Sequence, residues 1–230
     1  MDKIRENIIY IKENIESLKK VDNVEIVAVT KTFPYQDVLQ VLECGVKHIG
    51  ESKIQEALPK FEQIGNGLKG VIKHFIGHLQ SNKAKKAVEN FDLIHSLDSL
   101  GLAKEISKYA HNTAKTQNCL IEVKVSQEET KTGIKPEEVK DFCFQCLEMP
   151  NISIKGLMVI TPLSCNPEDS RPYFKQIYDL FTDMQNSFGK DDFNILSMGM
   201  SDDYKIAVEE GSNMVRIGSA IFGNRYYGNK

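Results

Sequence analysis

Lys31 is the first residue whose position could support chemistry. It follows residues 24–30, a run rich in β-branched residues that predicts a buried strand, and Pro34 lies where the next helix should begin. Alternation along the strand puts Lys31 on the same face as Val27 and Val29. Such a lysine is either a surface residue with its amine in water or a functional amine at the carboxyl end of a barrel. For an isolated lysine the surface interpretation is favoured, because lysine is rarely buried without a partner.

Two loops near the carboxyl terminus change that balance, since both have the composition of an anion site. Residues 196–204 run from a predicted strand through Gly199 to Ser201, which we expect to cap the following helix. Gly218 and Ser219 follow the next predicted strand. Either glycine alone could simply form a tight turn. Two such loops after the seventh and eighth strands match the place where barrels bind phosphate, so we predict a phosphate site there.

Two other groups of residues are poor candidates for a metal or redox site. His74 and His78 are four residues apart on a predicted strand, where that spacing spans about 13 Å, so one zinc ion cannot join them. Cys143 and Cys146 have the spacing of a CxxC motif but no second pair, and they fall in a helical pattern. We therefore expect both cysteines to be buried or half-buried helix residues.

Strand and helix patterns alternate along the chain. Strands are expected at residues 24–31, 47–52, 73–78, 91–97, 119–125, 152–160, 195–199 and 214–217. Helices are expected at residues 35–44, 53–64, 81–90, 99–109, 136–147 and 171–188, from residue 202, and at the amino terminus, where an apolar stripe predicts a helix packed on the domain. Without a linker to divide it, the chain is predicted to be a single (β/α)8 TIM-type barrel over residues 1–230, with an extra N-terminal helix. An open doubly wound sheet is the alternative, because closure is not visible in one sequence.

The composition limits the partners and the compartment. The net charge of −3, from 29 basic and 32 acidic residues, gives no indication of a nucleic acid or an anionic membrane as partner. The first 20 residues carry many charges and lack the apolar segment of a signal peptide, and no apolar run is long enough to span a bilayer. Five cysteines, an odd number, indicate a reducing compartment, so we expect a cytoplasmic protein.

Several stretches together resemble the pyridoxal phosphate homeostasis proteins, which share a fold with the barrel domain of alanine racemase. They extend from the first predicted strand almost to the end of the chain: Val27-Ala28-Val29-Thr30-Lys31-Thr32, Gly50-Glu51-Ser52, residues 74–83, Lys131-Thr132-Gly133, Gly156-Leu157-Met158, Leu196-Ser197-Met198-Gly199-Met200-Ser201 with Asp203-Tyr204, and Val215-Arg216-Ile217-Gly218 with Ile221-Phe222-Gly223. The stretches around Lys31 and Ser201 are the most specific.

This resemblance implies a pyridoxal 5'-phosphate (PLP) cofactor and gives roles to particular residues. Lys31 would hold PLP as a Schiff base, Ser201, Gly218 and Ser219 would bind its phosphate, and Arg216 would face its pyridine nitrogen. Alternation along the strand is compatible with an inward Arg216. An arginine keeps its proton at ordinary pH, so the ring nitrogen stays unprotonated and the ring is a weak electron sink.

Two positions depart from the family pattern, which usually has asparagine where this chain has Ser52 and Lys124. Ser52 is shorter and Lys124 adds a charge, so the polar contacts of those strands to a cofactor need not match those of the family. The residues assigned above are unaffected.

The resemblance favours a non-catalytic PLP-binding protein of intracellular vitamin B6 homeostasis, which stores the cofactor or hands it to recipients such as PLP-dependent apo-enzymes. The alternative is a PLP-dependent, racemase-like enzyme of the same fold. A two-base racemase needs a second base from an added β-domain, and this chain ends a few residues after its eighth strand, so we expect no such activity. A lysine Schiff-base aldolase would share the lysine and the phosphate site but would purify colourless.

Overall fold

The computed structural model describes residues 3–126 and 132–223, and within them eight parallel strands form a closed barrel. The strands are β1 (Glu25–Val29), β2 (His48–Glu51), β3 (Ile72–Phe75), β4 (Leu93–Leu97), β5 (Gln117–Val123), β6 (Ile152–Val159), β7 (Ile195–Ser197) and β8 (Met214–Ile217). They follow one another around the barrel in chain order, and β8 closes it by pairing with β1, where Val27 lies opposite Arg216. The predicted (β/α)8 barrel is confirmed, and the open sheet is excluded.

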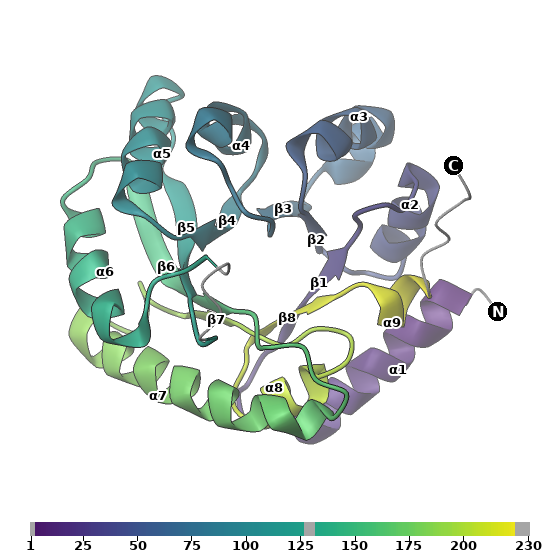
Figure 1. Cartoon of the computed structure of the whole chain (residues 1–230). Helices are drawn as coiled ribbons and strands as arrows, with labels where there is room; N and C mark the ends of the chain where they lie inside the picture. Colours follow the sequence, from purple (N-terminus) through teal and green to yellow (C-terminus); the bar gives the residue numbers. More distant parts are fainter. Residues whose placement is uncertain (1–2, 127–131, 224–230) are drawn as a thin grey trace.

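Helices surround the strands in a ring (Figure 1). They are α1 (Lys3–Leu18), α2 (Tyr35–Glu43), α3 (Ile54–Ile64), α4 (Ala84–Asn90), α5 (Leu100–Asn112), α6 (Val139–Leu147), α7 (Arg171–Phe188), α8 (Tyr204–Glu209) and α9 (Ser219–Phe222). The predicted helices that open at Ser81 and Pro136 begin instead with short 3-10 turns, Ser81–Lys83 and Pro136–Glu138. The glycine-rich residues 65–68 form another such turn, and a fourth, Pro167–Ser170, precedes α7.

Helix α1 is the predicted extra N-terminal helix. Its stripe of Ile4, Ile8, Ile11 and Ile15 is buried, and it belongs to one apolar cluster with residues of α8, β8 and α9. Figure 1 shows α1 lying beside α8 and α9, along the outside of the barrel. The helix is therefore packed on the domain, as its apolar stripe predicts.

The barrel interior contains an apolar layer near its middle. It consists of five buried side chains from different strands, Val27, Leu93, Leu120, Met158 and Met214. Alternation then directs Val29 and Arg216, two residues further along β1 and β8, toward the carboxyl end of the same interior. The interior is thus packed below that end, where side chains can gather around a ligand.

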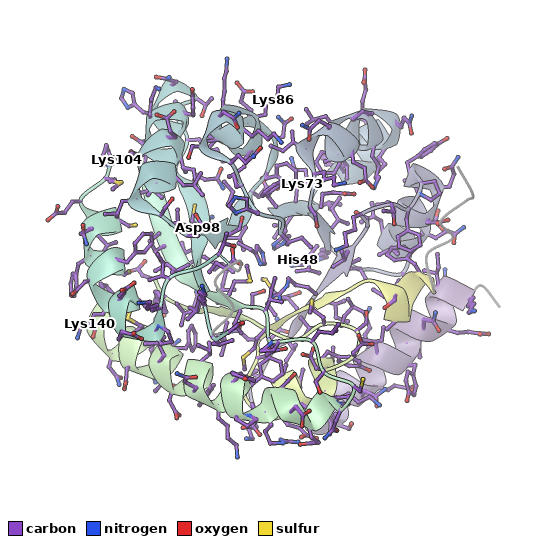
Figure 2. All side chains as sticks on the ribbon, in the orientation of Figure 1. His48, Lys73, Lys86, Asp98, Lys104 and Lys140 are labelled. Carbon is purple, nitrogen blue, oxygen red and sulfur yellow. The ribbon has the colours of Figure 1, made fainter. Side chains whose placement is uncertain are left out.

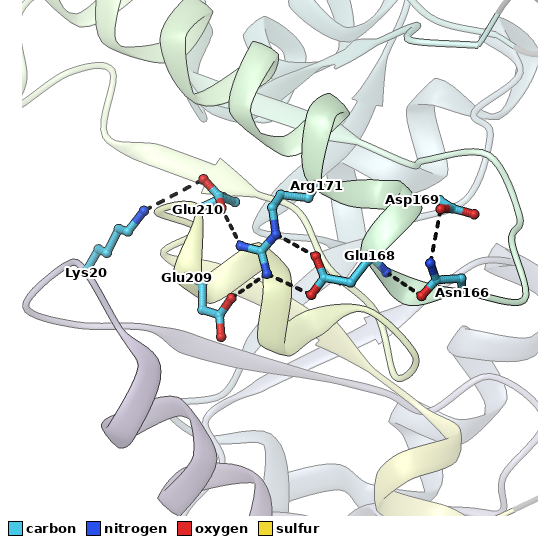
Figure 3. A network of polar contacts seen from close by, with 7 residues as sticks. All are labelled: Lys20, Asn166, Glu168, Asp169, Arg171, Glu209 and Glu210. Carbon is cyan, nitrogen blue, oxygen red and sulfur yellow. Dashed lines mark hydrogen bonds and ion pairs between the residues drawn. The ribbon is translucent and has the colours of Figure 1, made fainter.

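Arg171 connects the start of α7 to the end of α8 on the outside of the barrel (Figure 3). Its guanidinium donates to Glu168 at 2.7 Å, Glu209 at 2.7 Å and Glu210 at 2.5 Å. Glu210 also lies 3.7 Å from the Lys20 amine. Because Arg171 is partly exposed, these ion pairs mainly fix the arrangement of the helices and add little stability.

Cys143 and Cys146 lie buried on α6, as the sequence predicts. Burial raises the pKa of each thiol to about 12, so both are unreactive. No cluster in residues 3–126 and 132–223 offers three ligands to a metal ion. Nor does any helix of these residues have the length and apolar character to cross a membrane.

Candidate functional site

A cavity of about 200 Å³ lies at the carboxyl end of the barrel. It is lined by all five residues proposed from the sequence, Lys31, Ser201, Arg216, Gly218 and Ser219. The remaining lining residues are Val29, Ser52, Ile76, Ile160, Met200 and Asp202. A larger cavity, of about 420 Å³, lies at the opposite end, between α1 and the start of β1. The chemistry of the lining residues, and not the volume, identifies the smaller cavity as the candidate site.

Lys31 lies two residues beyond the end of β1, next to a residue with an unusual backbone conformation. The next residue, Thr32, has φ of 69°, a left-handed conformation that a β-branched residue rarely adopts. Its backbone N–H donates to the carboxylate of Glu56 on α3. Strain of this kind costs on the order of 1–3 kcal/mol and persists only where the surroundings impose it. The contact with Glu56 therefore helps to impose this conformation on the loop after β1.

A buried ion pair supports the residue before Lys31. Lys60 of α3 donates from Nζ to Glu51 Oε1 at 2.5 Å and to the Thr30 carbonyl oxygen at 2.7 Å, and the Thr30 hydroxyl donates to Glu51 Oε1 at 2.6 Å. Burial raises the pKa of Glu51, while the charge of Lys60 opposes the rise. Thr30 is thereby fixed through its backbone and its side chain, which sets where Lys31 leaves the strand.

The Ser201 hydroxyl joins the two predicted anion loops. Its oxygen accepts the backbone N–H groups of Gly218 and Ala220, both at 3.2 Å. With both lone pairs engaged by these donors, the hydroxyl proton is directed away from them. The backbone N–H and hydroxyl of Ser219 make no hydrogen bond within the described part of the chain. These groups are donors suited to an anion at the start of α9.

The predicted capping role of Ser201 is wrong. Helix α8 begins at Tyr204, after a turn in which Asp203 Oδ1 accepts the Met200 N–H at 2.7 Å. Ser201 lies within this turn and bonds instead to the loop that follows β8. A capping residue is inferred from its neighbours in sequence, whereas this partner is 17 residues away and is brought close by the barrel.

Arg216 is 4% exposed and is held by three hydrogen bonds. Its Nη1 donates to the carbonyl oxygen and the hydroxyl of Ser197, at 2.9 and 2.8 Å, and its Nη2 donates to the Val159 carbonyl oxygen at 2.9 Å. Burial lowers the pKa of Arg216 to about 10, against the attraction of Asp203 and Glu122, so the group stays protonated near neutral pH.

The Arg216 guanidinium has an N–H group available for a ligand in the cavity. No carboxylate forms an ion pair with it, and its Nε–H has no hydrogen-bond partner, among the residues that the structure describes. A buried cation with an unused N–H group suits a neutral aromatic nitrogen. The cavity thus combines an amine, anion donors and a fixed cation, which fits the aldehyde, phosphate and pyridine nitrogen of PLP.

The two departures from the family pattern differ in their position. Ser52 lines the cavity, whereas Lys124 is absent from its lining. Lys124 donates its backbone N–H to the Ile134 carbonyl oxygen at 2.9 Å, beside β5. Of the two substitutions, only the one at Ser52 changes the wall of the cavity.

Three histidines that meet inside the barrel were not predicted as a group from the sequence: His48, His74 and His95. His48 lies near the barrel centre in Figure 2. Their rings are hydrogen-bonded in series, His48 to His74 at 2.9 Å and His74 to His95 at 2.8 Å. His78, considered beside His74 as a zinc ligand, contacts Asp98 at 3.3 Å instead. The sequence contains one clue to this group: each of three successive strands carries one histidine at a position where alternation along the strand points the side chain into the barrel.

Comparisons with known proteins identify the family of this chain. The family model described as alanine racemase, N-terminal domain, matches residues 1–226. The chain is 42% identical over 207 residues to the pyridoxal phosphate homeostasis protein of Aquifex aeolicus (strain VF5), a match that covers 88% of each chain. It is 31% identical over 236 residues to the protein of that name from Escherichia coli (strain K12), covering all of both.

Solved structures show the same barrel. PipY of Synechococcus elongatus PCC7942, in its structure with PLP bound, has a TM-score of 0.85 and 31% identity, with 96% of this chain and 100% of that chain covered. An alanine racemase of Clostridium difficile 630 shares the fold alone, with a TM-score of 0.72 and 18% identity, and 57% of its chain is covered. The chain therefore belongs to the alanine racemase N-terminal domain family and, within it, to the pyridoxal phosphate homeostasis proteins.

Proposed function

We propose that the protein is a non-catalytic PLP-binding protein of cytoplasmic vitamin B6 homeostasis, acting as one domain over residues 1–230. One observation carries this proposal: Lys31, Arg216, Ser201 and Ser219 surround a single cavity. Relatives named pyridoxal phosphate homeostasis protein, and a PLP-bound relative of the same fold, support the choice of ligand.

Each group has a defined task in this proposal. The Lys31 amine would hold PLP as a Schiff base, because PLP supplies an aldehyde. Ser201 and Ser219 donate their hydroxyl protons to the phosphate, and the backbone N–H of Ser219 adds a third donor. The Arg216 Nε–H would donate a hydrogen bond to the pyridine nitrogen. The buried Glu51–Lys60 pair keeps Lys31 at the edge of the cavity.

Arg216 also explains why the site would hold its ligand without activating it. A guanidinium whose pKa is about 10 does not give its proton to a pyridine near neutral pH. A pyridine nitrogen facing Arg216 would stay unprotonated, so the site would give little activation to the α-proton of an amino acid. PLP held in this way would be kept until a recipient, such as a PLP-dependent apo-enzyme, takes it.

Proton exchange separates this role from that of a racemase-like enzyme. Holo protein is incubated with single L-amino acids in deuterated water, and α-proton exchange and chirality are followed with Lys31→Ala protein and free PLP as controls. We expect exchange no faster than with free PLP. Exchange at enzymatic turnover rates, abolished in Lys31→Ala protein, would overturn the non-catalytic role and favour the racemase.

A further inference from the structure

A series of hydrogen-bonded side chains crosses the interior of the barrel from one end to the other. It begins at Glu25, whose Oε2 lies 3.3 Å from His48 Nε2. His48 Nδ1 lies 2.9 Å from His74 Nε2, and His74 Nδ1 lies 2.8 Å from His95 Nε2. His95 Nδ1 lies 3.2 Å from Ser197 Oγ, which accepts from Arg216 Nη1 at 2.8 Å. We call Glu25, His48, His74, His95 and Ser197 the histidine series.

The series is buried from His74 to Ser197. His74, His95 and Ser197 are at most 1% exposed, so their polar atoms depend on one another for hydrogen bonds. Burial lowers the pKa of His74 to about 3 and that of His95 well below its ordinary value. Both rings are therefore neutral, and a neutral imidazole has one nitrogen that donates and one that accepts.

Arg216 fixes the direction of the series at one end. A guanidinium only donates, so Ser197 Oγ is the acceptor in that bond. The hydroxyl proton of Ser197 then has one acceptor within the described residues, His95 Nδ1. His95 must carry its proton on Nε2 and donate to His74 Nδ1, and His74 must donate from Nε2 to His48 Nδ1.

Glu25 requires the same direction at the other end. Its carboxylate only accepts when ionised, so His48 carries a proton on Nε2, facing Glu25. Burial lowers the pKa of His48, and its neutral ring then accepts on Nδ1, facing His74. The obligate donor, Arg216, and the obligate acceptor, Glu25, lie at the two ends of the series, and each demands the same tautomer of all three rings. Every hydrogen bond in the series therefore runs from Arg216 toward Glu25.

We propose that the histidine series is a positioning device for Arg216, in which all three imidazoles are held as the Nε2–H tautomer. Ser197 Oγ accepts a hydrogen bond from Arg216 and donates its own proton to His95. Nη1 is thereby anchored to Ser197 of the neighbouring strand β7, and the Nε–H stays available for the ligand. This inference rests on the proposed function, in which Arg216 faces the pyridine nitrogen of PLP.

The tautomers are measured first, on cofactor-free wild-type protein labelled with 15N in its histidine rings. Long-range 1H–15N correlation spectra near pH 7 distinguish a protonated from an unprotonated ring nitrogen. We expect protonated Nε2 and unprotonated Nδ1 for His48, His74 and His95, with exposed His111 as an internal reference. A protonated Nδ1 on His74 or His95 would overturn the proposal.

Variants at the two ends test the direction. Because each end demands the same tautomers, the single variants Ser197→Ala and Glu25→Ala should both keep the Nε2–H form of all three rings. Only the double variant Ser197→Ala/Glu25→Ala, which lacks both ends, should give the signals of mixed tautomers. Glu16→Ala is the matched control, since Glu16 lines the same larger cavity as Glu25 but pairs with Lys19 and touches no histidine. Mixed tautomers in either single variant, or wild-type tautomers in the double variant, would contradict the series.

Ligand affinity tests the positioning role. Ser197→Ala should weaken PLP binding about tenfold, the effect of losing one hydrogen bond to a charged group, and leave the weak affinity for inorganic phosphate unchanged. Equal losses for PLP and phosphate would mean that Ser197 has only a structural role. The tautomer spectra need no cofactor, so they stand even if Lys31 proves not to hold PLP.

Discussion

Replacement of Ser201 by alanine tests how the two anion loops act together. Ser201 Oγ accepts the N–H groups of Gly218 and Ala220, which leaves its own proton for an anion in the cavity. The Ser201→Ala variant removes that proton but keeps the backbone of both loops. The lost interaction is a hydroxyl bond to a charged phosphate, a contribution of about 1.5–3 kcal/mol.

This free energy corresponds to about a 10- to 150-fold increase in the dissociation constant for PLP. The N–H groups of Gly218 and Ala220 are only partly buried and can turn to water, so the unfolding free energy of Ser201→Ala should fall by less than about 1 kcal/mol. Affinity and stability are therefore expected to separate in this variant.

Absorbance titration with PLP and with pyridoxal, which lacks the phosphate, provides the assay. Ser201→Ala should lose affinity for PLP and keep the wild-type affinity for pyridoxal. Ser219→Ala should show the same pattern, and Ser17→Ala, at an exposed position of α1, is the matched control. Equal losses for both ligands, or unchanged PLP affinity in Ser201→Ala and Ser219→Ala, would refute the placement of the phosphate.

Three further predictions concern stability. Lys60→Met leaves Glu51 buried without its cation, so the unfolding free energy in denaturant should fall by about 3 kcal/mol; a loss below about 1 kcal/mol would contradict the role of the pair. Burial holds the pKa of His74 at about 3 in the folded state, below the ordinary 6.5, so this ring contributes stability above pH 6.5 that is lost as the pH falls toward 3. His74→Gln should therefore reduce the slope of stability against pH by about 1.4 kcal/mol per pH unit between these values, and equal slopes in urea unfolding would refute the assignment. Gly156→Ala puts a Cβ atom 1.8 Å from a carbonyl oxygen at φ of 149° and should lower the melting temperature strongly, whereas Gly101→Ala, with open space in α5, should raise it slightly; the reverse order would contradict the packing.

The barrel and its cavity residues could be predicted because they depend on local patterns. Alternation of strand and helix fixes the topology, and parallel strands bring their carboxyl ends together. Lys31 and Gly218 each follow a strand, so the fold brings them to one cavity although they are far apart in sequence. Helix α9 was missed because four residues are too few to show a helical period.

The contacts inside the site depend on distances that no local pattern contains. Burial of Lys60 opposes the usual behaviour of lysine and is possible only because Glu51 arrives from β2. The histidine series needs the register of neighbouring strands, in which Gly50 lies opposite His74 and His74 opposite Leu93. Parity shows which residues face inward, but only the register shows which of them meet.

The most direct test of the central claim is the identity of the lysine that holds PLP. Holo protein is reduced with borohydride, digested, and mapped by mass spectrometry, with Lys31→Ala protein as the control. We expect a pyridoxyl-phosphate label on the peptide that contains Lys31, and none on the corresponding Lys31→Ala peptide. A label on another lysine of the wild-type protein, or no label after incubation with PLP, would contradict it.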